Sequence, residues 1–126
     1  MKSYRELEVW QRAIELVEGT YQLTALLPQA EKFGLVSQLQ RAAVSIPANI
    51  AEGYGRSHRG DYLHHLSFAR GSLFEFETLL TVVGRLKLAS RSTVLPVWRV
   101  AQDVGKMLTR LIASLQSKAP IRNPKP

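Results

Sequence analysis

Cysteine is absent from the 126-residue sequence. The chain therefore has no disulfide, no thiolate nucleophile and no cysteine ligand for a metal, a composition compatible with a reducing cytosol. Long apolar runs are absent too, because the most apolar stretch, residues 79–83, is followed at once by Gly84 and Arg85. A membrane helix needs about 20 apolar residues, and a signal peptide needs an apolar run where this N-terminus carries charges. We expect a cytoplasmic protein with no membrane partner.

Common catalytic motifs are also missing. The sequence has no phosphate-binding loop, no Gly-x-Ser-x-Gly and no Glu-x-x-His pair of the kind that holds two irons in helical bundles. The turn at 53–60 begins like a dinucleotide fingerprint, but His58 stands at the third glycine position and no strand precedes it. Asp61, His64 and His65 could share a helix face, but no further metal ligand is nearby in sequence. We therefore expect a protein that is not an enzyme and that holds no cofactor and no metal.

Positive charge is abundant and unevenly distributed. The chain has 17 Lys and Arg against 10 Asp and Glu, a formal net charge of +7. Residues 87–126 alone sum to +7, from eight basic side chains and one acidic one, so the rest of the chain sums to zero. Such a field attracts polyanions, nucleic acid above all. The alternative is that the charge only keeps the protein in solution.

Four segments show the apolar periodicity of helices: residues 4–26, from 29 or 34 to 54, from 57 or 59 to 88, and from 92 onward. The apolar stripes of the four segments are Leu7, Trp10, Ile14, Val17 and Tyr21; Val36, Leu39, Ala43, Ile46 and Ile50; Leu66, Ala69, Leu73, Phe76, Leu80 and Val83; and Val97, Val100, Val104, Leu108, Leu111 and Leu115. Short connections between such helices predict an all-α, antiparallel up-down-up-down four-helix bundle over residues 1–118. We predict that residues 119–126 form a disordered, basic, Pro-rich tail.

The third segment carries a second apolar stripe, formed by Phe68, Leu79, Val82 and Leu86. An apolar arc this wide needs more than one neighbouring surface to cover it. The pattern therefore predicts that the protein assembles with copies of itself.

Prolines, glycines and serines mark the expected helix ends. Pro47 interrupts the second helix and predicts a kink, while Gly53 and Gly55 predict a left-handed stop. Ser57 is a candidate N-cap for the third helix and Ser92 for the fourth. Pro96 would then fall in the first turn of the fourth helix, where the amide has no helical partner.

The segment 41–53 combines small residues with a polar strip of Arg41, Ser45, Asn49 and Glu52. The strip could form a polar interface or contact a ligand. Alternatively, Ser45 or Asn49 could hydrogen-bond the backbone groups that Pro47 leaves without a partner. The sequence favours the second interpretation and leaves both open.

Basic side chains gather at two places that could contact phosphate. Arg56 and Arg59 lie in the turn after the second helix, where they could instead complement the negative end of its dipole. Arg99, Lys106 and Arg110 share a helical face with Asp103, which could instead be an ordinary solvated face. We predict these five cations as the nucleic-acid contacts: Arg56, Arg59, Arg99, Lys106 and Arg110.

Three motifs resemble those of a known family. The first is Tyr4-x-x-Leu-x-Val-Trp-Gln-x-Ala13; the second runs from Glu31-x-Phe-Gly-Leu to Arg56 and includes Arg-Ala-Ala-Val-Ser-Ile-Pro-Ala-Asn-Ile-Ala-Glu-Gly; the third is Ala69-Arg-Gly-Ser-Leu-x-Glu75. They are similar to the bacterial four-helix-bundle family first met as proteins encoded in intervening sequences of large-subunit ribosomal RNA genes. The resemblance covers about residues 4–115.

The resemblance implies a barrel-like homopentamer of antiparallel four-helix bundles. The family includes relatives of the accessory protein of diversity-generating retroelements, a basic pentamer that binds nucleic acid and a reverse transcriptase. The resemblance and the charge together predict a non-catalytic homo-oligomeric scaffold that binds RNA or DNA, with a partner protein beside it. The alternative is a protein–protein interaction adaptor with no nucleic-acid role.

Overall fold

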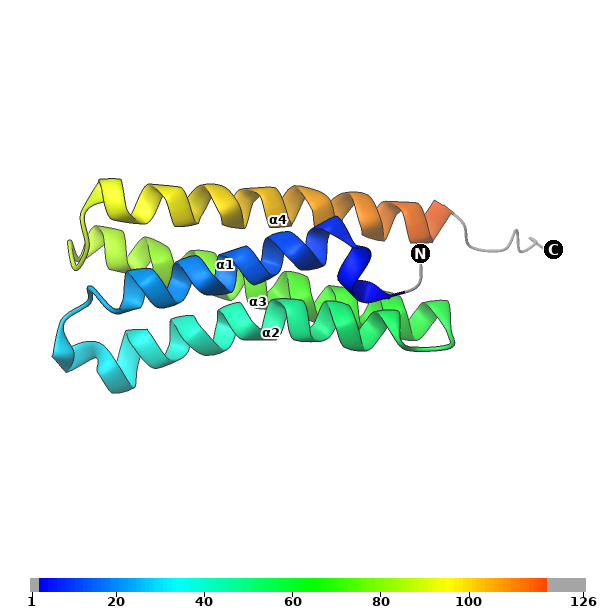
Figure 1. The fold of residues 1–126 in the computed structure, drawn as a ribbon, viewed down its shortest axis with the longest axis horizontal. Helices are drawn as coiled ribbons and strands as arrows, with labels where there is room; N and C mark the ends of the chain where they lie inside the picture. The colour runs from blue at the N-terminus through cyan, green and yellow to red at the C-terminus, as the bar shows by residue number, and fades with distance from the viewer. Residues whose placement is uncertain (1–2, 118–126) are drawn as a thin grey trace.

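The computed structural model describes residues 3–117, and within this range every regular element is helical and no strand occurs. The four long helices are α1 (Glu8–Thr24), α2 (Ser37–Tyr54), α3 (Arg59–Arg85) and α4 (Arg91–Ser117). They lie side by side in an elongated bundle (Figure 1). The α1–α2 and α3–α4 connections lie at one end of the bundle and the α2–α3 connection lies at the other. The prediction of an all-α fold with four helices is confirmed, and the predicted tail at 119–126 lies outside the described residues.

Each helix packs against two neighbours, α1 against α2 and α4, and α3 against α2 and α4. The reason is visible in the spacing of the buried residues, which are three or four positions apart along every helix. The core residues from α1, α2, α3 and α4 are Val9, Ala13, Leu16 and Leu23; Leu39, Ala42, Ala43, Ile46 and Ile50; Leu66, Ala69, Leu73, Phe76, Leu80 and Val83; and Val97, Ala101, Val104, Leu108 and Ile112. The stripe predicted for α3 is confirmed in full.

The N-terminal segment is not one continuous helix from residue 4, as predicted. A 3₁₀ turn, Tyr4–Glu6, is capped by the Ser3 hydroxyl, which accepts a hydrogen bond from the Arg5 amide at 3.1 Å. Leu7 is extended, and α1 begins after it. The phase of the predicted α1 stripe is wrong as well, since Leu7, Trp10 and Val17 are only partly buried and Tyr21 is exposed.

The start of α2 differs from a simple helix. A 3₁₀ turn, Gln29–Glu31, leads into a wide turn, Lys32–Val36, in which Gly34 has non-helical angles (φ −109°, ψ −107°). From Ser37 onward α2 is helical throughout and includes the buried Pro47. The non-helical backbone angles in this stretch are therefore at Gly34, whereas a kink was expected at Pro47.

The predicted left-handed stop at Gly53 and Gly55 is wrong. Gly55 has right-handed angles (φ −77°, ψ −4°), and Gly53 is buried inside α2. Within residues 3–117 the left-handed residue is Lys87 (φ 57°), which follows α3. There the Lys87 amide donates to the Gly84 carbonyl and the Leu88 amide to the Val83 carbonyl, the paired bonds of a Schellman stop.

The predicted caps of α3 and α4 are each displaced by a residue or two. The residue before α3 is His58 and not Ser57, and its side chain makes no capping bond. Ser90 rather than Ser92 precedes α4, and its hydroxyl accepts from the Thr93 amide at 3.3 Å. Because α4 begins at Arg91, Pro96 lies in its second turn rather than its first.

Candidate nucleic-acid interface

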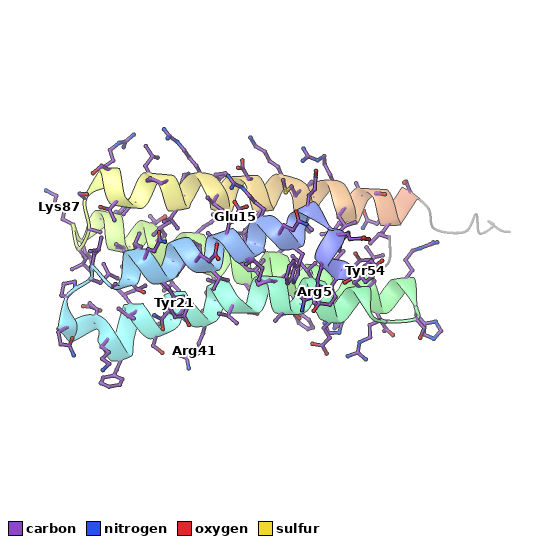
Figure 2. The ribbon with its side chains drawn as sticks, in the orientation of Figure 1. Arg5, Glu15, Tyr21, Arg41, Tyr54 and Lys87 are labelled. Carbon is purple, nitrogen blue, oxygen red and sulfur yellow. The ribbon has the colours of Figure 1, made fainter. Side chains whose placement is uncertain are left out.

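Three of the five predicted cations lie on α4, and Figure 2 shows nitrogen-tipped side chains projecting away from the bundle along this helix. Arg99, Lys106 and Arg110 are all exposed. None of them has an acidic partner within residues 3–117. Their charges are therefore free to meet an anion from solution.

Asp103 interrupts the row of cations on α4, but Arg12 of α1 binds it. The Arg12 guanidinium donates to Asp103 Oδ2 from Nη2 at 2.7 Å and from Nε at 3.2 Å. Arg12 also pairs with Glu15 on its own helix. These hydrogen bonds, to Asp103 first and Glu15 second, raise the pKa of Arg12. Arg12 therefore binds two carboxylates, and no ion pair joins Asp103 to Arg99, Lys106 or Arg110 within residues 3–117.

Lys106 and Arg110 line a groove between α3 and α4 with a volume of about 450 Å³. Its lining comes from both helices: Arg70, Leu73, Phe74 and Glu77 of α3, and Gln102, Gly105, Lys106, Thr109 and Arg110 of α4. We call it the α3–α4 groove. Arg70 was not among the predicted contacts, yet it joins Lys106 and Arg110 here. Arg99 is not part of the lining.

One carboxylate faces the same groove. Glu77 Oε2 accepts a hydrogen bond from Gln102 Nε2 at 3.0 Å. Burial raises the pKa of Glu77, and the bond from Gln102 opposes that shift. With three cations against one carboxylate, the groove is positive in sum.

The other two predicted cations lie at the α2–α3 turn, at the end of the bundle away from the α3–α4 turn (Figure 1). Arg56 Nη2 is 2.7 Å from Glu52 Oε2, so its charge is already paired within α2's last turns. Arg59 is the first residue of α3 and is half-buried. The structure therefore separates the predicted set into an unpaired group on α4 and a partly neutralised group at the turn.

Residues 5–110 match the sequence model of the family described as 23S rRNA-intervening sequence protein. This chain belongs to that family. A search of curated proteins found no match.

The family fold is supported by a solved structure. The chain superposes on the crystal structure of a protein with unknown function from the S23 ribosomal protein family from Bacteroides thetaiotaomicron with a TM-score of 0.77. The two chains are 24% identical, and the match covers 83% of this chain and 95% of the other. At this identity the comparison shows the shared fold alone.

The polar strip of segment 41–53 forms hydrogen bonds across the α2–α3 interface. Asn49 Nδ2 donates to Ser45 Oγ at 3.1 Å, and Ser45 Oγ is 2.8 Å from Ser72 Oγ of α3. Asn49 Oδ1 lies 3.2 Å from His65 Nδ1, also of α3. Asn49 Nδ2 additionally bonds the Ser45 carbonyl, whereas Pro47 removes the partner of the Ala43 carbonyl. The strip therefore joins two helices. The carbonyl that Asn49 bonds, that of Ser45, is not the carbonyl whose helical partner Pro47 removes.

The candidate metal ligands are drawn into other contacts or left apart. His65 belongs to the α2–α3 hydrogen bonds, and the His64 ring packs edge-on to Phe68 with centroids 4.5 Å apart. Asp61 is exposed in the first turn of α3. Across residues 3–117 no three His, Cys, Asp or Glu side chains gather closely enough to hold a metal ion. None of the helices in that range combines the length and apolar character needed to cross a membrane.

Proposed function

We propose that this member of the 23S rRNA-intervening sequence protein family is a non-catalytic homo-oligomeric scaffold that binds RNA or DNA without sequence preference. The proposed assembly is a pentamer of antiparallel four-helix bundles, with a partner protein beside it. The phosphate contacts are the cations of α4, led by Lys106 and Arg110. Arg56 and Arg59 at the α2–α3 turn are secondary contacts, because Arg56 must first leave Glu52.

The observation that carries the proposal is the row of exposed, unpaired cations on α4. Phosphate binding needs basic side chains whose counterions can be released, and it carries no sequence information of its own. Arg12 binds Asp103, the carboxylate on this helix face, and none of Arg99, Lys106 and Arg110 forms an ion pair within residues 3–117.

Self-assembly is supported by apolar side chains that the single chain leaves uncovered. Phe68 is 52% exposed and Leu86 is 61% exposed, and both belong to the second apolar stripe of α3. Phe33, before α2, is 90% exposed. Water contact with side chains this large costs free energy that burial between subunits would recover.

Fluorescence anisotropy with a labelled oligonucleotide, titrated at two or more salt concentrations, tests the proposal. Reversing two charges, with Lys106→Glu and Arg110→Glu, should weaken binding and reduce the slope of log K against log salt by about 0.7 to 0.9 for each lost contact. The matched control is Lys32→Glu with Arg41→Glu, which changes the net charge equally on the α2 side, where Figure 2 shows Arg41 projecting outward. Binding that is absent at low salt, or that loses as much in the control, contradicts the proposal.

The second candidate is a protein–protein adaptor with no nucleic-acid role. The exposure of Phe33 and Phe68 favours it, because aromatic side chains dominate protein interfaces. In that case reversing the charges of Lys106 and Arg110 leaves the nucleic acid that co-purifies with the protein unchanged.

A further inference from the structure

The α3–α4 groove contains an aromatic side chain that the bundle itself does not need. Phe74 is 56% exposed, whereas its neighbour two positions on, Phe76, is fully buried in the core. Phe74 belongs to neither apolar stripe of α3. Its ring lies among the lining residues Arg70, Lys106 and Arg110.

The floor of the groove is set by the close approach of α4 to α3. A Cβ on Gly105 would lie 3.3 Å from Leu73 Cδ2, so the glycine lets the two helices come together there. The side chains on either side of this contact then form two walls, with Arg70 and Phe74 on α3 and Lys106 and Arg110 on α4. Cations thus lie on both walls, and the exposed ring of Phe74 belongs to the α3 wall.

We propose that the α3–α4 groove binds single-stranded nucleic acid, with a base stacked on Phe74 and the flanking phosphates held by Arg70, Lys106 and Arg110. This inference rests on the proposed nucleic-acid binding and narrows it to strands with unpaired bases. Single-strand sites combine a basic track with aromatic rings on which bases stack. In a duplex the base faces are covered by their neighbours, so Phe74 has nothing to stack against.

Glu77 is the one carboxylate among the residues that line the groove, where three cations outnumber it. Its Oε2 accepts a hydrogen bond from Gln102 of α4. An acidic peptide would also match the charge of the groove, but it has no base face to place on Phe74. Stacking on Phe74 therefore distinguishes a single-stranded nucleic acid from an acidic peptide.

The test compares single-stranded oligothymidylate with a duplex of equal length by fluorescence anisotropy at low salt. The wild-type protein should bind the single strand more tightly. Phe74→Ala should weaken single-strand binding by roughly five- to a hundredfold and leave duplex binding within about twofold. Phe74→Trp should retain or tighten single-strand binding, a result that a misfolded variant cannot give.

The matched control is Tyr21→Ala, because Tyr21 is an aromatic residue exposed to a similar extent on α1 and is not among the residues that line the groove. Equal losses in Tyr21→Ala and Phe74→Ala, or equal affinity for polyglutamate and the single strand, would overturn the inference. If the wild-type protein binds both the single strand and the duplex and Phe74→Ala has no effect, the inference is wrong and the proposed function stands. Absence of binding to either strand defeats the proposed function, and the inference with it.

Discussion

Gly53 lies where α2 closely approaches α3. A Cβ built on it would be 2.7 Å from His65 Cβ and 3.2 Å from the Tyr62 carbonyl oxygen. Neither atom is the end of a flexible chain, so Gly53→Ala must push the two helices apart. We expect this variant to lose about 1–3 kcal/mol of unfolding free energy, measured by urea denaturation followed by circular dichroism.

Gly71→Ala is the control for Gly53→Ala. Gly71 lies inside α3, and a Cβ there would meet no atom within 4 Å. Alanine is favoured over glycine in a helix, so this variant should gain about 0.5–1 kcal/mol. If both variants shift stability by the same amount and sign, the close approach at Gly53 is not what constrains that position.

Tyr62 provides a pH-dependent test of the same helix contact. Burial, with a smaller contribution from Tyr54, raises the pKa of the Tyr62 phenol to about 12, from an ordinary value of 10.0. Between these values the folded chain keeps a proton that the unfolded chain releases, so the free energy of unfolding falls as pH rises. Tyr62→Phe should remove the part of this fall in unfolding free energy that comes from the phenol. Denaturation midpoints of both proteins across this pH range measure the difference. An unchanged alkaline decline would contradict the burial of the phenol.

Single residues show the limit of what the sequence could predict. A pattern cannot distinguish a glycine needed for its backbone angles from one needed for a close neighbour, so Gly53 was misinterpreted and Lys87 was missed. The cations of α4 were found because charge repeats at helical spacing within one segment. Arg70 and Phe74 were missed, although an aromatic residue outside both stripes of α3 was a visible signal.

Between helices, the ion pair of Arg12 and Asp103 joins α1 to α4. Both side chains are partly exposed, so their interaction is weakened by water and salt. A double-mutant cycle with Arg12→Ala and Asp103→Ala should give a coupling free energy of about 0.2–1 kcal/mol in favour of the pair. Urea denaturation of the four proteins at low and high salt measures it. A coupling that does not fall with salt would contradict the assignment.

The helices themselves were predictable to different degrees. In α3 the apolar residues of the main stripe are separated from polar ones by a clear three-four spacing, and every member is buried. In α1 large apolar residues occur in two phases, and the phase with Val9, Ala13 and Leu16 is the buried one. Which phase is buried depends on the packing of α1 against α2 and α4, which its own periodicity does not specify. Trp10, of the other phase, is partly buried, and the Tyr4 ring packs edge-on to it at 5.2 Å.

On the scale of the whole molecule, the cations of α4 and two large exposed apolar side chains lie on different elements. The cations lie on α4 and in the α3–α4 groove, whereas Phe33 lies before α2 and Phe68 packs on His64 of α3. The concentration of net charge after residue 87 predicted where the cations lie. The positions of the exposed apolar side chains could not be predicted in the same way, because they depend on which side chains the folded bundle leaves uncovered.

A pentamer that presents several α4 surfaces should show a salt dependence that grows with the length of the bound strand. One α4 helix of 27 residues is roughly 40 Å long, so a short strand contacts one subunit. A longer strand that reaches a second subunit adds about 0.7 to the log–log salt slope for each further phosphate contact, at a stoichiometry of one strand per oligomer. We expect anisotropy titrations with short and long oligothymidylates to give clearly different slopes, with sedimentation velocity reporting the size of the complex. Equal slopes, with several single subunits bound along the long strand, would mean that each chain binds on its own.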